Sequence, residues 1–137
     1  MVPTPADIRA MAKQYTDAWS SHSPEAVASF YEPDGRITIN LGEPTIGREA
    51  IAEVAQGFFN EFPDLVVYMD DIRTSANRAI FCWTLEGTDG RPEGKGHAVR
   101  ISGWEAWTLS DNVRVIESYG YFDAEEYERQ LEHGISG

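Results

Sequence analysis

Residues 78–122 read RAIFCWTLEGTDGRPEGKGHAVRISGWEAWTLSDNVRVIESYGYF and give the clearest indication of how the chain folds. The segment is rich in Val, Ile, Trp and Tyr, and its apolar residues alternate with polar ones, as in half-buried β-strands. We therefore predict long strands over Arg78–Gly87, Lys95–Leu109 and Val113–Phe122. The connection between the first two predicted strands is rich in glycine, but no helix start follows it. This favours a hairpin loop over a phosphate-binding loop.

Upstream of these strands the pattern is mainly helical. Thr4 and Pro5 are typical of a helix start, and the apolar spacing continues to Trp19. Helical spacing returns after Gly47 and stops at Pro63. The sequence therefore predicts two longer helices before the main run of strands.

Shorter elements complete the pattern. A brief helix opens at Ser23 and carries Tyr31, and strands are predicted over Arg36–Asn40 and Leu65–Ile72. Asp123 opens a last short helix. Helices first and long strands afterwards predict an α+β fold with helices on one face of a curved sheet.

Length and composition indicate one globular domain over residues 1–137, with 42% apolar and 25% charged residues. This length falls within the roughly 100–200 residues typical of a domain. No apolar run approaches the roughly 18 residues that span a bilayer, and the N-terminus lacks a signal-peptide core. The single cysteine, Cys82, agrees with a reducing compartment, so we expect a cytoplasmic protein.

The charge excludes several classes of partner. Eleven basic residues against 23 acidic ones give a net charge of −12. Nucleic acids and anionic membranes are therefore disfavoured. The sequence has no Walker loop, no dinucleotide-binding glycine motif and no metalloprotease motif, and its three histidines are scattered. We therefore expect no metal and no cofactor.

Four polar residues on otherwise apolar segments are candidates for catalysis: Tyr15, Asn40, Glu86 and His97. A phenol on the apolar face of the first helix either orients a substrate oxygen or bonds a neighbour such as Tyr31. Asn40 ends a predicted strand and His97 begins one. Each is therefore either a site residue or an ordinary residue at a loop edge.

Glu86 shares one strand face with Cys82 and Thr84. If that face turns inward, the Glu86 carboxyl is desolvated and its pKa is raised, as a general acid or base requires. If it turns outward, Glu86 is a solvated acid. The last two predicted strands pose a similar choice, because Trp104 and Tyr119 either line a pocket or bury the outer sheet face in a dimer.

From about Ile8 to Leu131 the sequence resembles the nuclear-transport-factor-2-like superfamily, and within it the SnoaL-like polyketide cyclases. The resemblance rests on FYEPD at 30–34, IGREAI at 46–51, FPDL at 62–65, WTLEGT at 83–88 and VIESY at 115–119. It implies a cone-shaped, cystatin-like α+β barrel, in which the sheet wraps around the N-terminal helices and encloses an apolar pocket. It also implies a homodimer.

The catalytic positions of this superfamily are mostly replaced. Tyr15 matches the oxyanion-hole tyrosine of the ketosteroid isomerases, but their aspartate base falls at Ile39 and their second acid near Gly103. The acid/base aspartate of the cyclases falls at Gly120. Isomerisation of a steroid by the aspartate-dependent mechanism of the ketosteroid isomerases is therefore not expected.

Limonene epoxide hydrolase, another relative, has an Asp-Arg-Asp set that falls at Gly120, Thr84 and Glu86. Only Glu86 retains a carboxylate.

The leading hypothesis is a SnoaL-like protein that binds a small hydrophobic metabolite and, if it is an enzyme, acts as a cofactor-independent cyclase, isomerase or hydrolase. Glu86 would transfer the proton, Tyr15 and Asn40 would orient an oxygen, and His97 would pair with the carboxylate. The predicted pocket residues are Trp19, Tyr31, Phe58, Cys82, Thr84, Trp104 and Tyr119. The alternative is a non-catalytic binding or interaction module of the same fold.

Overall fold

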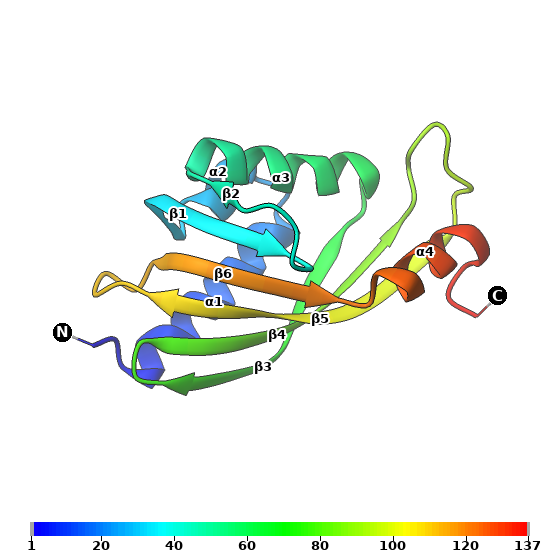
Figure 1. Cartoon of the computed structure of the whole chain (residues 1–137). Coiled ribbons are helices and arrows are strands. Elements are labelled where there is room, and N and C mark those ends of the chain that lie inside the picture. The colour runs from blue at the N-terminus through cyan, green and yellow to red at the C-terminus, as the bar shows by residue number, and fades with distance from the viewer. Residues whose placement is uncertain (1, 137) are drawn as a thin grey trace.

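A six-stranded curved sheet with helices packed on one face forms the frame of the protein (Figure 1). The computed structural model describes residues 2–136. In chain order the elements are α1 (Pro5–Ser20), α2 (Pro24–Ala28), β1 (Tyr31–Ile39), β2 (Thr45–Ile46), α3 (Arg48–Glu61), β3 (Val66–Ser75), β4 (Arg78–Thr88), β5 (Ala98–Leu109), β6 (Val115–Phe122) and α4 (Ala124–His133). The predicted α+β class is confirmed.

The helix starts follow from side-chain caps. Thr4 Oγ1 accepts a hydrogen bond from the Asp7 N–H at 3.1 Å, and Asp123 Oδ1 accepts one from the Glu126 N–H at 3.1 Å. Each cap satisfies a backbone donor that has no partner within the helix. Gly47 caps α3 with a φ of 92°, a left-handed conformation that glycine adopts without strain.

The sheet runs in the order β2-β1-β6-β5-β4-β3, and only the pairing of β1 with β6 is parallel. The first and last long strands therefore lie side by side, with β1 toward one edge of the sheet and β6 between β1 and β5 (Figure 1). Within residues 2–136, none of the helices has both the length and the apolar character that crossing a membrane requires.

Tyr31 belongs to a strand, and the prediction that placed it in the second helix was wrong. Helix α2 ends at Ala28, and Tyr31 pairs with Val115 of β6. The Val115 N–H donates to the Phe30 carbonyl at 2.8 Å, so strand pairing begins before the Pro33 turn signal. The close approach to β6 also explains Gly35, because a Cβ there would lie 2.7 Å from the Val115 carbonyl oxygen.

Alternate residues of β4 and β5 face the helices. The cross-strand pairs on this inner face are Phe81 with Glu105, Trp83 with Gly103, and Leu85 with Ile101. Buried side chains of α1, including Ile8, Ala12 and Tyr15, belong to the same core as these inward residues. The residues between them in sequence lie on the outer face of the sheet.

Candidate functional site

A cavity of about 80 Å³ opens between the inner sheet face and the helices. Its lining is Trp19, Ile37, Ile39, Val54, Phe58, Val67, Phe81, Trp83, Leu85, Ile101, Glu105, Gly120, Phe122 and Tyr127. Glu105 is the one acidic residue in this set, and no basic residue belongs to it. The cavity is therefore a largely apolar space with one carboxyl group in its wall.

Glu105 is buried, with 7% of its surface exposed, and four side chains from α1, β1, β5 and β6 surround its carboxyl group with hydrogen-bond donors. Its Oε1 accepts hydrogen bonds from Trp107 Nε1 at 2.9 Å and from Ser118 Oγ at 2.8 Å. The Tyr15 hydroxyl lies 3.2 Å from Oε1 and 3.1 Å from Oε2. The Tyr31 hydroxyl lies 3.4 Å from Oε1 but 2.9 Å from the Tyr15 oxygen, so the phenols form a chain that ends on the carboxyl group.

The two carboxyl oxygens of Glu105 differ in how many hydrogen bonds they accept. Oε1 receives Trp107, Ser118 and the phenols, whereas Oε2 receives only the shared Tyr15 hydroxyl. A carboxylate oxygen that already accepts several hydrogen bonds is a poor place for a proton. A proton taken up by Glu105 therefore belongs on Oε2.

Burial controls the ionisation of this network. Desolvation raises the pKa of Glu105, although the hydrogen bonds from Trp107, Ser118 and the two phenols oppose the rise. Desolvation and the nearby Glu105 charge raise the pKa of Tyr15 and of Tyr31 well above the usual value. Both phenols therefore remain protonated donors while Glu105 is the group able to exchange a proton.

Glu86 does not lie in the cavity. It sits on the outer face of β4, where Arg100 Nε lies 3.3 Å from Glu86 Oε2 and 38% of the Glu86 side chain is exposed. The strand turns Trp83 and Leu85 inward, so every even-numbered neighbour points away from the helices. The inward orientation on which the sequence hypothesis for Glu86 depended is therefore not present.

Cys82 and Thr84 lie on the outer face of β4, as Glu86 does. Thr84 Oγ1 makes hydrogen bonds to Asp70 and Ser102 there. Trp104 and Tyr119 also face outward, with 45% and 40% of their surfaces exposed. None of these four predicted pocket residues lines the cavity.

Asn40 and His97 also lie outside the cavity lining. Asn40 has a φ of 50°, and its Oδ1 accepts a hydrogen bond from the Phe122 N–H at 2.9 Å. This contact fastens the end of β1 to β6. His97 precedes β5, and its ring lies close to Gly134 beyond α4.

The remaining predicted residues do meet at the site. Trp19 and Phe58 line the cavity with their rings 6.0 Å apart, edge to face. Tyr15 and Tyr31 lie behind that lining and reach Glu105 through their hydroxyls. The sequence analysis missed Glu105, whose signal was its shared strand face with Ile101 and Trp107.

Two glycines occupy the positions at which the resemblance implies acids, and their surroundings differ. A Cβ at Gly103 would collide with the Tyr121 carbonyl oxygen and would lie 2.6 Å from Cζ2 of Trp83. A Cβ at Gly120 would meet nothing nearer than Glu105 Cγ at 3.8 Å. Trp83 thus fills the space beside Gly103, whereas Gly120 leaves open space next to Glu105.

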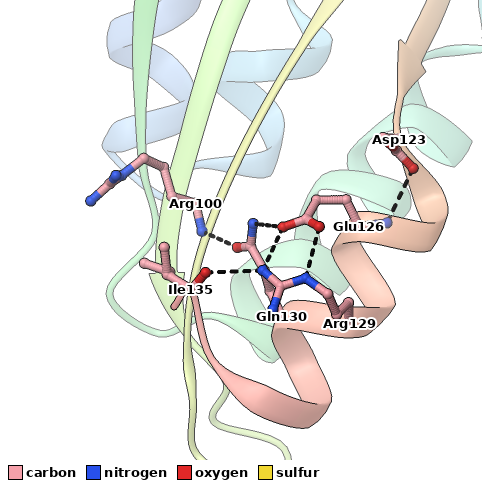
Figure 2. Close-up of polar contacts among 6 residues, drawn as sticks. All are labelled: Arg100, Asp123, Glu126, Arg129, Gln130 and Ile135. Carbon is pink, nitrogen blue, oxygen red and sulfur yellow. Dashed lines mark hydrogen bonds and ion pairs between the residues drawn. The ribbon is translucent and has the colours of Figure 1, made fainter. Parts of the chain in front are cut away.

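Helix α4 contributes Tyr127 to the cavity wall, and Figure 2 shows how this helix is fastened. Gln130 Oε1 accepts a hydrogen bond from the Arg100 N–H at 2.7 Å, and its Nε2 donates to Glu126 at 2.7 Å. Arg129 pairs with Glu126 and donates to the Ile135 carbonyl. The Gln130–Arg100 bond joins α4 to β5, and the other contacts order the Gln130 side chain and the residues that follow the helix.

The chain has the architecture of the α+β cone proteins, with a buried pocket between a curved sheet and its helices. Residues 12–117 match the SnoaL-like domain family, and the chain belongs to that family. A search of curated proteins finds no match. Over residues 2–136, no three His, Cys, Asp or Glu side chains gather as a metal-ligand set.

Solved structures agree on the fold. A protein from Jannaschia sp. CCS1, described as a SnoaL-like polyketide cyclase, superposes with a TM-score of 0.84 at 16% identity, covering 96% of each chain. AclR from Streptomyces galilaeus, described as a hydroxylase, superposes with a TM-score of 0.80 at 19% identity. The match covers 94% of this chain and 83% of the AclR chain. A protein with a ketosteroid isomerase-like fold from Catenulispora acidiphila DSM 44928, in complex with trimethylamine, superposes with a TM-score of 0.81 at 13% identity, and the match covers 98% of each chain.

Proposed function

We propose that this protein binds a small, largely apolar ligand in the cavity and exchanges a proton with it through Glu105. The observation that carries the proposal is the position of Glu105, a buried carboxyl group in an otherwise apolar lining. The volume of about 80 Å³ is well below the roughly 300–1,000 Å³ of sites for drug-sized ligands. Trimethylamine in the Catenulispora neighbour is a ligand of suitably small size.

Isomerisation by proton shuttling is the reaction that suits a single carboxyl group. Glu105 Oε2 would accept a proton from a carbon beside a carbonyl group, while the C–H electron pair forms a C=C bond and the carbonyl π pair moves to oxygen. Reversal returns the proton to the same carbon or to another. The absence of acids at Ile39, Gly103 and Gly120 disfavours a mechanism that needs a second carboxylate. This chemistry needs no cofactor.

Cyclopentanone is a suitable first probe, because exchange of its α-protons in D₂O reports proton transfer without a known substrate. We expect the wild-type protein to accelerate exchange and Glu105→Gln to abolish the acceleration while still binding the ketone. Binding is read from the fluorescence of Trp19 and Trp83, both of which line the cavity. Unchanged exchange in Glu105→Gln would remove Glu105 from the chemistry, and binding without exchange in the wild type would favour a non-catalytic binding protein.

We further propose a homodimer formed through the outer sheet face. Register places Ile80, Ala106 and Tyr119 side by side there, next to the Trp104–Tyr121 pair, whose ring centroids are 5.3 Å apart. An exposed apolar patch on a sheet is typical of a protein interface. Sedimentation should show a dimer that Trp104→Glu dissociates. A monomeric wild-type protein would contradict this assignment.

A further inference from the structure

The indole of Trp83 carries a polar group that the fold leaves unused. Among the buried side-chain nitrogen and oxygen atoms of residues 2–136, Trp83 Nε1 is the one without a hydrogen-bond partner. A buried donor left unpaired costs about 1–3 kcal/mol, and such groups in native proteins call for a specific explanation. Trp83 also lines the cavity.

The position of Trp83 relative to Glu105 supports a role at the ligand. Trp83 pairs with Gly103 on β5, so Glu105, two residues further along that strand, is its diagonal neighbour on the same inner face. Diagonal neighbours lie roughly 7–8 Å apart, within reach of aromatic and long side chains, and both residues line the cavity, so one small ligand there can contact both. The indole is held in place because its Cζ2 edge packs over Gly103.

The donors around Glu105 are already committed, and this distinguishes Trp83 from them. The hydroxyl of Tyr15 donates to Glu105, and the hydroxyl of Tyr31 bonds to Tyr15. Trp107 Nε1 and Ser118 Oγ donate to Glu105 as well. A ligand oxygen in the cavity therefore has one uncommitted buried donor to accept from.

We infer that the Trp83 indole N–H positions the ligand by donating a hydrogen bond to an acceptor oxygen that the ligand carries. The inference rests on the proposed function, because it assigns the ligand class of the same cavity. A carbonyl oxygen held by Trp83 would place an adjacent carbon toward Glu105 Oε2. Trp83 would also stabilise the negative charge that develops on this oxygen when the carbon loses its proton.

The test compares cyclopentanone with methylenecyclopentane, which has nearly the same shape but no acceptor oxygen. Trp83→Phe keeps an aromatic ring and removes the N–H. We expect it to weaken ketone binding about fivefold to tenfold, as expected for one neutral hydrogen bond, and to leave binding of the alkene nearly unchanged. Trp19→Phe is the matched control in the same lining and should change the affinity for both probes alike.

Wild-type protein labelled with ¹⁵N gives a second readout that needs no folded variant. The indole N–H signal that disappears in Trp83→Phe, or that is assigned directly, should move downfield with the ketone and not with the alkene. Equal binding of both probes with no indole shift would overturn the inference and leave the small-ligand proposal standing. Failure of the wild type to bind either probe would overturn both.

Discussion

The Tyr15 hydroxyl lies 3.1 Å from Glu105 Oε2, although the two residues are 90 positions apart in the chain. The bond joins the first helix to the fifth strand across the core. Trp107 and Ser118 hold the other carboxyl oxygen, so the orientation of Glu105 is fixed before any ligand enters. A proton-exchanging group that is already oriented needs no reorganisation at the moment of reaction.

Tyr15→Phe should destabilise the protein and make Glu105 harder to ionise. The change removes a donor to Glu105 and leaves the Tyr31 hydroxyl without its nearest partner, at a cost of about 1–3 kcal/mol. It also removes a hydrogen bond that lowers the pKa of Glu105, so that pKa should rise. Urea unfolding and ¹³C-detected titration of Glu105 measure the two effects.

Tyr121→Phe is the control for this substitution, because Tyr121 lies on the outer face against Trp104. Its effect on the free energy of unfolding should stay within about 0.5 kcal/mol. Equal losses in the two variants would show that the Tyr15 hydroxyl contributes nothing specific.

Stability should depend on pH through Glu105. Burial raises the pKa of Glu105 in the folded chain above its unfolded value of about 4.3. Its contribution to folding is therefore complete below the unfolded pKa and is lost as the pH rises through the folded pKa. Glu105→Gln cannot ionise, so the wild type should lose stability relative to this variant across that interval. A constant difference between the two urea-unfolding free energies from pH 4 to pH 8 would contradict the assignment.

Two glycine-to-alanine substitutions should have opposite consequences. Gly103→Ala forces a Cβ against Trp83 and the Tyr121 carbonyl, and we expect a loss of about 1–3 kcal/mol from overpacking. Gly120→Ala meets no atom nearer than 3.8 Å and should fold normally while reducing the cavity next to Glu105. Calorimetry and ketone titration separate the two effects. Normal ketone binding by a folded Gly120→Ala would place the ligand elsewhere.

The N-cap of α4 should affect both stability and the cavity. Asp123→Ala removes the acceptor of the Glu126 N–H and should cost about 1 kcal/mol. Tyr127 in the next turn lines the cavity, so ligand affinity should fall as well. Asp123→Asn keeps a capping oxygen and should behave nearly as the wild type in thermal unfolding. An equal loss with Asn would mean that charge, and not capping, is what Asp123 supplies.

The fold could be predicted from local signals because those signals agree with the tertiary structure. The Thr4, Gly47 and Asp123 boundaries all reappear as helix caps. Tyr31 could not be placed in the same way. Its pairing with Val115 joins segments far apart in the sequence, and no local pattern carries that information.

The candidate site was only partly predictable, because alternation shows which residues share a strand face but not which face is buried. Strand β4 carries apolar residues on both faces, with Ile80 and Cys82 outside and Phe81 and Trp83 inside. Hydrophobicity therefore could not decide the direction of Glu86. Strand β5 likewise carries a tryptophan on each face, with Trp104 exposed and Trp107 buried. The sequence pattern therefore could not show that Glu105 faces the core.

The parallel pairing of β1 with β6 determines when the protein can fold during its synthesis. Residues 31–39 leave the ribosome well before their partner strand at 115–122, from which they are separated by more than 70 residues of chain. Contacts so distant in sequence make folding slow. The Gly120 and Phe122 wall of the cavity is likewise missing until β6 docks. A nascent chain therefore cannot complete the cavity before β6 has been synthesised, even though the helices that cover the cavity are made much earlier.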